Sequence, residues 1–349
     1  DQAVYNGIVD SIAILEGKDT KKPKDAIPDI LTDALAVSLD TSVGHNYIED
    51  AEDRWDYYHK REQKFPFNIE MLDKITDGGI TPKTLTVFLG GTGVGKTLVK
   101  THFACQYMKQ GLDVLYITME MAEERIAERI DANLMDIDID QLYIIPKDSF
   151  QKKLNKLNIG RLIIKEYPTA SAHSGHFRAL FNELALKKSF KPDVLFIDYL
   201  NICASSRFKG GNIGSYFYIK AIAEELRGLA VEFNVPLFSA TQTTRTGFVS
   251  TDIGLEDTAE SFGLPATADF MFALISNDEL EALGQMKIKQ LKNRYNDPTY
   301  HRRFVVGVDR PKMRLFDCEQ SAQDELVDIG PVFDKTTSGE RVASEKTEH

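Results

Sequence analysis

Cysteine, tryptophan and long apolar runs are all scarce in this 349-residue chain, which has three cysteines and one tryptophan. Cys105, Cys203 and Cys318 are far apart in apolar surroundings, which favours buried free thiols in a reducing compartment over a disulfide framework or a zinc site. Strand-like apolar stretches such as residues 194–197 are far shorter than the roughly 18 residues of a membrane-spanning helix. The sequence therefore predicts a chain that neither crosses a membrane nor depends on disulfides.

An excess of basic charge is also missing. The 42 basic and 53 acidic residues give a net charge of −11, which argues against a surface coated for nucleic acid but leaves room for a local basic groove. Residues 317–349 contain nine acidic and three basic residues, so this end biases the total. Its polar, poorly patterned composition predicts an acidic, disordered tail at 320–349.

The first 64 residues are predicted to be a helical region. Val4, Ile8, Ile12 and Leu15 fall on one helical face, and residues 27–35 carry a second such pattern. Short helices cannot bury apolar stripes alone, so these must dock on the main domain, a neighbouring subunit or a missing N-terminal part. The chain begins at Asp1 without a methionine or a secretion signal, which we interpret as a boundary with something upstream.

From about residue 71 the hydrophobic pattern alternates between strand and helix. Strand-like runs occur at 84–90, 113–119, 161–167, 193–199 and 235–241, with amphipathic helical patterns at 96–110, 175–189 and 217–233. This alternation predicts an α/β domain at 65–319 with a mostly parallel sheet covered by helices. Further strand candidates at 269–275, 285–291, 302–308 and 313–317 predict an antiparallel C-terminal extension.

The most specific motif is GGTGVGKT at residues 90–97, which matches G-x-x-x-x-G-K-T between a strand-like run and a helical one. The backbone N–H groups that could cradle phosphate oxygens belong to Gly91, Thr92, Gly93, Val94 and Gly95. Lys96 would then reach the β- and γ-phosphates and Thr97 would ligate Mg²⁺. The motif therefore predicts a nucleoside triphosphate site.

Two carboxylates are candidates for the chemistry at that site. Asp198 closes the apolar run 194–197, where an acid can organise Mg²⁺ and its water. Tyr199 follows it instead of a glutamate, so a general base must come from elsewhere. Glu120 ends another strand-like run and could deprotonate an attacking water, because sites in parallel sheets lie at the carboxyl ends of strands. An ordinary helix-start glutamate is the alternative for Glu120.

Weaker signals lie further along the chain. Gln242 ends a strand-like run, where its amide could sense a γ-phosphate. The last strand region carries Lys287, Lys289, Lys292 and Arg294. A cation delivered from there across a subunit interface would stabilise a transferring phosphoryl group, whereas solvated strand-edge charge is the alternative.

Five segments taken together resemble the ordered motifs of the DnaB-family replicative helicases. They are the phosphate loop, TMEM at 118–121, IDYL at 197–200, SATQTTR at 239–245 and KNR at 292–294. The resemblance covers about residues 65–316, is closest to the members from T-even-type phages, and implies a RecA-like P-loop NTPase fold. It extends more weakly through residues 1–64, which would be the linker that follows a missing N-terminal collar domain.

The resemblance implies a homohexamer that encircles single-stranded DNA and translocates 5′ to 3′ by hydrolysing ATP, with Mg²⁺, at its subunit interfaces. The implied roles are phosphate and Mg²⁺ binding for Lys96 and Thr97, catalytic base for Glu120, Mg²⁺ support for Asp198, sensor for Gln242, and interfacial finger for Arg294 helped by Lys292. Primase, a helicase loader and replisome proteins are the implied partners. A phage member of this family would work in the cytoplasm of its bacterial host.

Family members grip DNA with loops that correspond here to the stretches after Asp198 and after Gln242. The candidate DNA contacts are Arg207, Lys209, Gly210, Gly211, Arg245, Glu260 and Phe262. Such loops can offer backbone N–H groups and hydroxyls to phosphates without regard to base sequence. The family's D-L-R-E-S-G pattern reads DTAESF here, with Ala259 at the arginine position. Arg207, Lys209 or Arg245 could replace that charge, or each could be a solvated loop charge.

Two other functions fit parts of this pattern. A RecA-type recombinase uses the same core, ATP and DNA, but forms an open filament and exchanges strands. The KNR segment and the linker-like helices favour the helicase. A non-motor ATP-binding switch would hydrolyse ATP slowly and without response to single-stranded DNA, and the combination of base, sensor and finger argues against it.

Overall fold

The computed structural model describes residues 2–18, 23, 26–28, 30–31, 34, 46–59, 62–208, 214–244, 253–255, 258 and 263–319. The chain divides into two units, Asp1–Glu62 and Gln63–His349. The tail predicted at 320–349 lies outside the described residues. Within the described ranges, no helix combines the length and the apolar character that a membrane span requires.

The first unit contains helices α1 (Gln2–Leu15) and α3 (Ala51–His59). The predicted N-terminal helix is confirmed, but its apolar stripe is exposed: Ile8, Ile12 and Leu15 are 46%, 47% and 58% exposed. The opposite face packs instead, because a Cβ at Gly7 would lie only 2.6 Å from the Cβ of Ala34. The small residue at position 7 therefore sets which face of α1 is covered within this unit.

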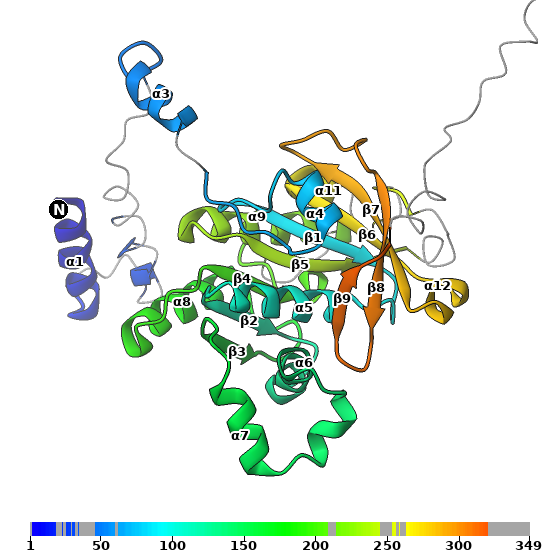
Figure 1. The fold of residues 1–349 in the computed structure, drawn as a ribbon. Coiled ribbons are helices and arrows are strands. Elements are labelled where there is room, and N and C mark those ends of the chain that lie inside the picture. Colours follow the sequence, from blue (N-terminus) through cyan, green and yellow to red (C-terminus); the bar gives the residue numbers. More distant parts are fainter. Residues whose placement is uncertain are drawn as a thin grey trace, which may run out of the picture. The chain divides into compact units, whose positions relative to one another are not determined.

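The second unit is built on one nine-stranded sheet with the strand order β3-β2-β4-β5-β1-β6-β7-β8-β9 (Figure 1). The strands are β1 (Leu85–Gly90), β2 (Val114–Thr118), β3 (Leu162–Glu166), β4 (Val194–Asp198), β5 (Leu237–Gln242), β6 (Phe270–Ile275), β7 (Gln285–Asn293), β8 (Arg303–Asp309) and β9 (Arg314–Asp317). β1 to β6 pair in parallel, and β7 to β9 add antiparallel strands. The predicted parallel sheet with an antiparallel extension is confirmed, although β6 belongs to the parallel part.

Helices cover both faces of this sheet. The longer ones are α5 (Lys96–Lys109), α6 (Glu123–Met135), α8 (Ser174–Lys188) and α9 (Ser215–Phe233), and the shorter ones are α4 (Glu70–Ile75), α7 (Lys147–Asn155), α11 (Gly263–Thr267), α12 (Asp278–Ala282) and the 3₁₀ turns η2 (Ile139–Tyr143) and η3 (Leu200–Ile202). α5 and α6 pack on one face and α8 and α9 on the other. The central strands are therefore buried on both sides, which explains why they read as unbroken apolar runs.

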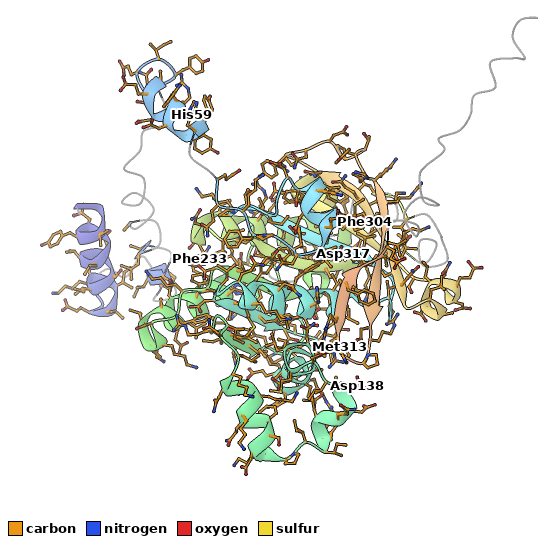
Figure 2. All side chains as sticks on the ribbon, viewed as in Figure 1. His59, Asp138, Phe233, Phe304, Met313 and Asp317 are labelled. Carbon is orange, nitrogen blue, oxygen red and sulfur yellow. The ribbon has the colours of Figure 1, made fainter. Side chains whose placement is uncertain are left out.

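Aromatic side chains tie together the strands that carry the predicted site. Phe196 of β4 and Phe238 of β5 stack with ring centroids 4.9 Å apart, and Phe88 of β1 stacks on Phe238 at 6.4 Å. On the other face, Phe233 at the end of α9, labelled in Figure 2, stacks on Phe181 with ring centroids 3.8 Å apart. Such packing fixes the relative positions of β1, β4 and β5, which lead into the phosphate loop and end at Asp198 and Gln242.

Candidate nucleotide site

The loop between β1 and α5 has the backbone geometry of an anion cradle. Gly93 and Gly95 adopt positive φ angles of 81° and 115°, a region that favours glycine. A Cβ at Gly95 would also lie 3.2 Å from the Cε of Met286. No side chain among the described residues caps α5, so its first backbone N–H groups remain available to a bound anion.

Lys96 folds back over this loop. Its Nζ donates to the carbonyl oxygens of Gly90 at 2.9 Å and Gly91 at 2.8 Å. Burial, followed by the charge of Lys100, lowers the pKa of Lys96 to about 8, while Glu120 and Asp198 oppose that shift. The Lys96 ammonium group thus lies at the phosphate loop. There, the phosphate oxygens of a bound nucleotide would replace the two carbonyl oxygens as its hydrogen-bond partners.

Asp198 is the centre of a buried polar network at the end of β4. Its Oδ2 accepts hydrogen bonds from Thr97 Oγ1 at 3.2 Å and from the Tyr116 hydroxyl at 3.0 Å, and its Oδ1 forms an ion pair with Lys100 Nζ. The side chains of Lys100 and Asp198 are 0% and 1% exposed. Burial lowers the pKa of Lys100, and the carboxylate of Asp198 opposes that shift.

These residues fit Mg²⁺ bound together with a nucleotide. Thr97 and Asp198 offer a hydroxyl and a carboxylate, the hard oxygen donors that Mg²⁺ uses. Among the described residues, no three His, Cys, Asp or Glu side chains gather around a common point. A metal held here would therefore complete its shell with phosphate oxygens and water.

Glu120 lies just beyond the end of β2, next to the strand that carries Asp198. Thr118 is the register partner of Asp198, so Glu120 projects two residues further along the same edge. Its side chain is exposed, and its charge acts on both Lys96 and Lys100. This position would let a carboxylate reach water beside a bound γ-phosphate.

Gln242 lies at the carboxyl end of β5, paired in register with Gly90 at the start of the loop. Its Nε2 donates a hydrogen bond to the Tyr199 hydroxyl at 3.1 Å. The amide is therefore joined to the residue that follows Asp198, and it sits between the strand of the phosphate loop and the strand of the acid.

Lys292 and Arg294 lie at the end of the sheet where the parallel strands begin. The phosphate loop of the same chain lies at the other end, where these strands finish. β7 runs antiparallel to β6, and its last residue Asn293 pairs with the first residue of β6, Phe270. Arg294 forms an ion pair with the buried Asp269 at 3.0 Å, and Lys292 donates to the carbonyls of Pro265 and Ala266. Neither side chain can serve the site of its own chain.

The predicted DNA contacts are only partly described. Arg207 forms an ion pair with Glu224 of α9, and its backbone N–H is held near Glu225. Glu225 also accepts hydrogen bonds from Ser174, Ser205 and the backbone N–H of Ser206, which anchor the stem of the loop. The other predicted contacts, Lys209, Gly210, Gly211, Arg245, Glu260 and Phe262, lie outside the described residues, as does Ala259.

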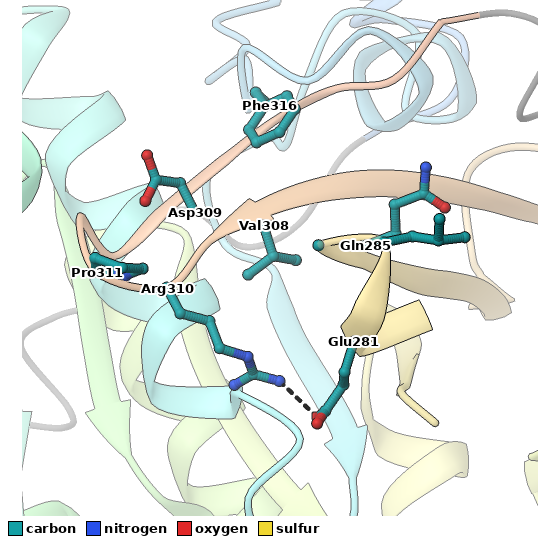
Figure 3. A pocket seen from close by; sticks show the side chains of 9 residues that line it. Glu281, Gln285, Val308, Asp309, Arg310, Pro311 and Phe316 are labelled. Carbon is teal, nitrogen blue, oxygen red and sulfur yellow. Dashed lines mark hydrogen bonds and ion pairs between the residues drawn. The ribbon is translucent and has the colours of Figure 1, made fainter. Parts of the chain in front are cut away.

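A hollow of about 450 Å³ opens at the same edge of the sheet as the phosphate loop (Figure 3). It is lined by residues of α12, β7, β8 and β9, with Leu283, Val308 and Phe316 as apolar walls. Arg310 Nη2 and Glu281 Oε1 form an ion pair of 2.8 Å at its rim. Its lining residues belong to α12, the antiparallel strands and their connections, and none of residues 90–97 is among them.

Several side chains around this site carry no motif in the sequence. Lys100 follows Lys96 by four residues and so lies on the same helical face, which is a usable signal. Tyr116 contributes a hydroxyl from within the apolar strand β2, where no motif marks it, and the bond of Tyr199 to Gln242 joins two motifs that are far apart in the sequence. At the other end of the sheet, no motif marks Asp269 just before β6, although it holds both Arg227 and Arg294.

The sheet order, the phosphate loop and the strand-end acid define a RecA-like P-loop NTPase. The chain belongs to the family of the DnaB-like helicase C terminal domain, whose model matches residues 65–295. Over 313 residues it is 45% identical to the "DnaB-like replicative helicase" of Enterobacteria phage T4, covering 87% of this chain and 66% of that protein. The chain thus spans just under two thirds of the length of that relative.

Solved structures agree on the fold. A separately solved ATPase domain matches with a TM-score of 0.66 at 16% identity, covering 78% of this chain and 100% of that one. A DnaB-like replicative helicase studied with primase matches with a TM-score of 0.63 at 17% identity, covering 91% of this chain and 78% of the other. The predicted fold class and family are therefore confirmed.

Proposed function

We propose that this protein is an ATP-dependent replicative DNA helicase, which works as a hexamer around single-stranded DNA and moves 5′ to 3′. The observation that carries the proposal is the assembly of Lys96, Thr97 and Asp198 at one sheet edge, with Glu120 beside them. Membership of the DnaB-like family supports DNA unwinding as the work that this ATPase performs. The ring and the polarity are what the family resemblance implies.

ATP would bind with its phosphates in the glycine loop and its Mg²⁺ between Thr97 and Asp198. The hollow walled by Leu283, Val308 and Phe316 would take the base, because it opens at the same end of the sheet as the loop. Pockets for such ligands are mostly apolar with a few polar groups. On this proposal, Phe316→Ala weakens binding of ATP but leaves binding of tripolyphosphate, which has no base, unchanged.

Hydrolysis needs a base and a charge stabiliser at the γ-phosphate. Glu120 would orient and deprotonate the attacking water. Lys96 would stabilise the negative charge that develops on the phosphoryl oxygens. Arg294 and Lys292 would complete the site of a neighbouring subunit, which fits their position at the far edge of their own sheet. Because the site would be shared by two subunits, hydrolysis of its ATP would change the contacts between them and could move one relative to the other.

The stem that Glu225 anchors supports a role for the following loop in gripping DNA. Glu225 accepts hydrogen bonds from Ser174, Ser205 and Ser206, so the residues just before the loop are held in place. Lys209, Gly210 and Gly211 in this loop, and Arg245, Glu260 and Phe262 after β5, would contact the phosphate backbone. Primase, a helicase loader and other replisome proteins are the proposed protein partners.

A forked-substrate assay tests the proposal. Fluorescently labelled forks with a single 5′ tail, a single 3′ tail or both are incubated with the protein, ATP and Mg²⁺. Unwinding that requires ATP and the 5′ tail supports the helicase with the stated polarity. Strand pairing between homologous DNAs without unwinding would favour the recombinase, and ATP turnover without either would favour a switch.

A further inference from the structure

A second lysine lies inside the nucleotide site, beneath the loop. Lys100 is four residues after Lys96 on α5 and is completely buried. Its Nζ forms an ion pair with Oδ1 of Asp198, the acid assigned to Mg²⁺. The remaining oxygen, Oδ2, faces Thr97 and Tyr116. One carboxylate oxygen is thus committed to a fixed cation before any metal or nucleotide arrives.

We infer that Lys100 is a positioning residue that neutralises Asp198, so that Mg²⁺ enters the site together with ATP rather than ahead of it. An unpaired buried carboxylate next to a threonine hydroxyl would attract a divalent cation by itself. The Lys100 ammonium cancels that field and leaves only Oδ2 directed at Thr97. The phosphates of ATP must then supply most of the attraction for the metal.

The surroundings of the pair strengthen this inference. The charged groups that act on Lys100 are Asp198 and Glu120, with the Cys203 thiol also near. Lys96 in turn is influenced by Lys100. Replacing Lys100 would therefore remove the ion pair of Asp198 and leave it with the hydroxyls of Thr97 and Tyr116 and the charge of Lys96.

The inference rests on the proposed ATP site and is tested by binding. A fluorescent ATP analogue is titrated into the full chain across a range of Mg²⁺ concentrations, and the Mg²⁺ midpoint for binding is measured. Lys100→Gln removes the charge while keeping a hydrogen-bond donor for Asp198, and Lys100→Met removes both. Lys109→Met, on the same helix but away from Asp198, is the matched control, and thermal unfolding verifies that each variant is folded.

In both Lys100 variants, the Mg²⁺ midpoint for binding of the analogue is expected to be about tenfold lower. The reason is that loss of the Lys100 charge leaves Asp198 more attractive to Mg²⁺. Lys109→Met should match the unaltered protein. In an Asp198→Asn background, Lys100→Gln should produce no further shift, because Lys100 acts through Asp198.

An unchanged or raised Mg²⁺ midpoint in folded Lys100→Gln or Lys100→Met overturns the inference, and so does a shift that persists in the Asp198→Asn background. In those cases nucleotide still binds, and the proposed function stands. Failure of the unaltered chain to bind the analogue at any Mg²⁺ concentration overturns both.

Discussion

The side-chain amide of Gln242 donates a hydrogen bond to the hydroxyl of Tyr199, 3.1 Å away, and so joins the ends of β5 and β4. Tyr199 follows the acid of the site, and the loop after Gln242 contains predicted DNA contacts. This bond therefore connects the nucleotide site with a segment that would grip DNA.

Tyr199→Phe tests that connection. Without the hydroxyl, Gln242 loses a hydrogen bond worth about 1 kcal/mol, so ATP turnover stimulated by DNA should fall by about fivefold. Nucleotide affinity should stay the same, since the phosphate cradle is intact. Steady-state ATPase rates with and without single-stranded DNA measure this. Tyr143→Phe, which removes a hydroxyl bonded to Glu128 on α6, should have no effect.

Glu120→Gln should separate binding from hydrolysis. The amide keeps the shape of the side chain but cannot accept a proton, so the turnover rate should fall by about 100-fold or more. Nucleotide binding, measured by equilibrium fluorescence, should persist. Glu124→Gln, in the first turn of α6, is the matched control and should turn over normally. Normal ATP turnover by Glu120→Gln would show that Glu120 is not the catalytic base and would favour the alternative of an ordinary helix-start glutamate.

Arg294→Ala should abolish hydrolysis in trans. Since an arginine finger is worth about 1,000-fold or more, the variant alone should be nearly inactive. Lys96→Ala should also be inactive, because it lacks the phosphate contact. Mixed oligomers of the two variants contain some interfaces with both residues intact, so ATPase activity should partly return. Verified mixed oligomers without activity would contradict the interfacial role.

Nucleotide binding should depend on pH through Lys96. Its pKa in the folded chain is about 8, below the usual 10.5, so the free protein loses this charge as the pH rises through 8. Bound phosphates favour the charged form, so binding above pH 8 should take up a proton and weaken by up to about tenfold per pH unit. Calorimetry at about pH 8.5 in buffers of different ionisation enthalpy measures that uptake. Lys96→Met should show none of it.

Local patterns predicted most of the fold and the phosphate loop. The central strands are apolar on both faces, and the glycines, Lys96 and Thr97 are contiguous, so their positions follow from a short stretch of chain. The network around Asp198 was not predictable in the same way. It joins Asp198 of β4 to Lys100 of α5 and Tyr116 of β2, and the packing of α5 on the sheet and the pairing of β2 with β4 bring them together.

The position of Arg294 also depends on long-range structure. Its motif predicts a finger, but the antiparallel turn from β6 to β7 is what puts it at the far edge of the sheet, held by Asp269. The exposed stripe of α1 is a similar case, because Gly7 and Ala34 determine the covered face. The sequence predicted an apolar helix there, and only the folded unit shows which side stays open.

The most direct test of the helicase assignment is the ATPase rate with and without single-stranded DNA, with particle imaging of the same ATP-bound sample. A hexameric helicase should show strong stimulation by DNA together with closed or split six-membered rings. Turnover that ignores DNA, or open filaments in place of rings, would contradict it.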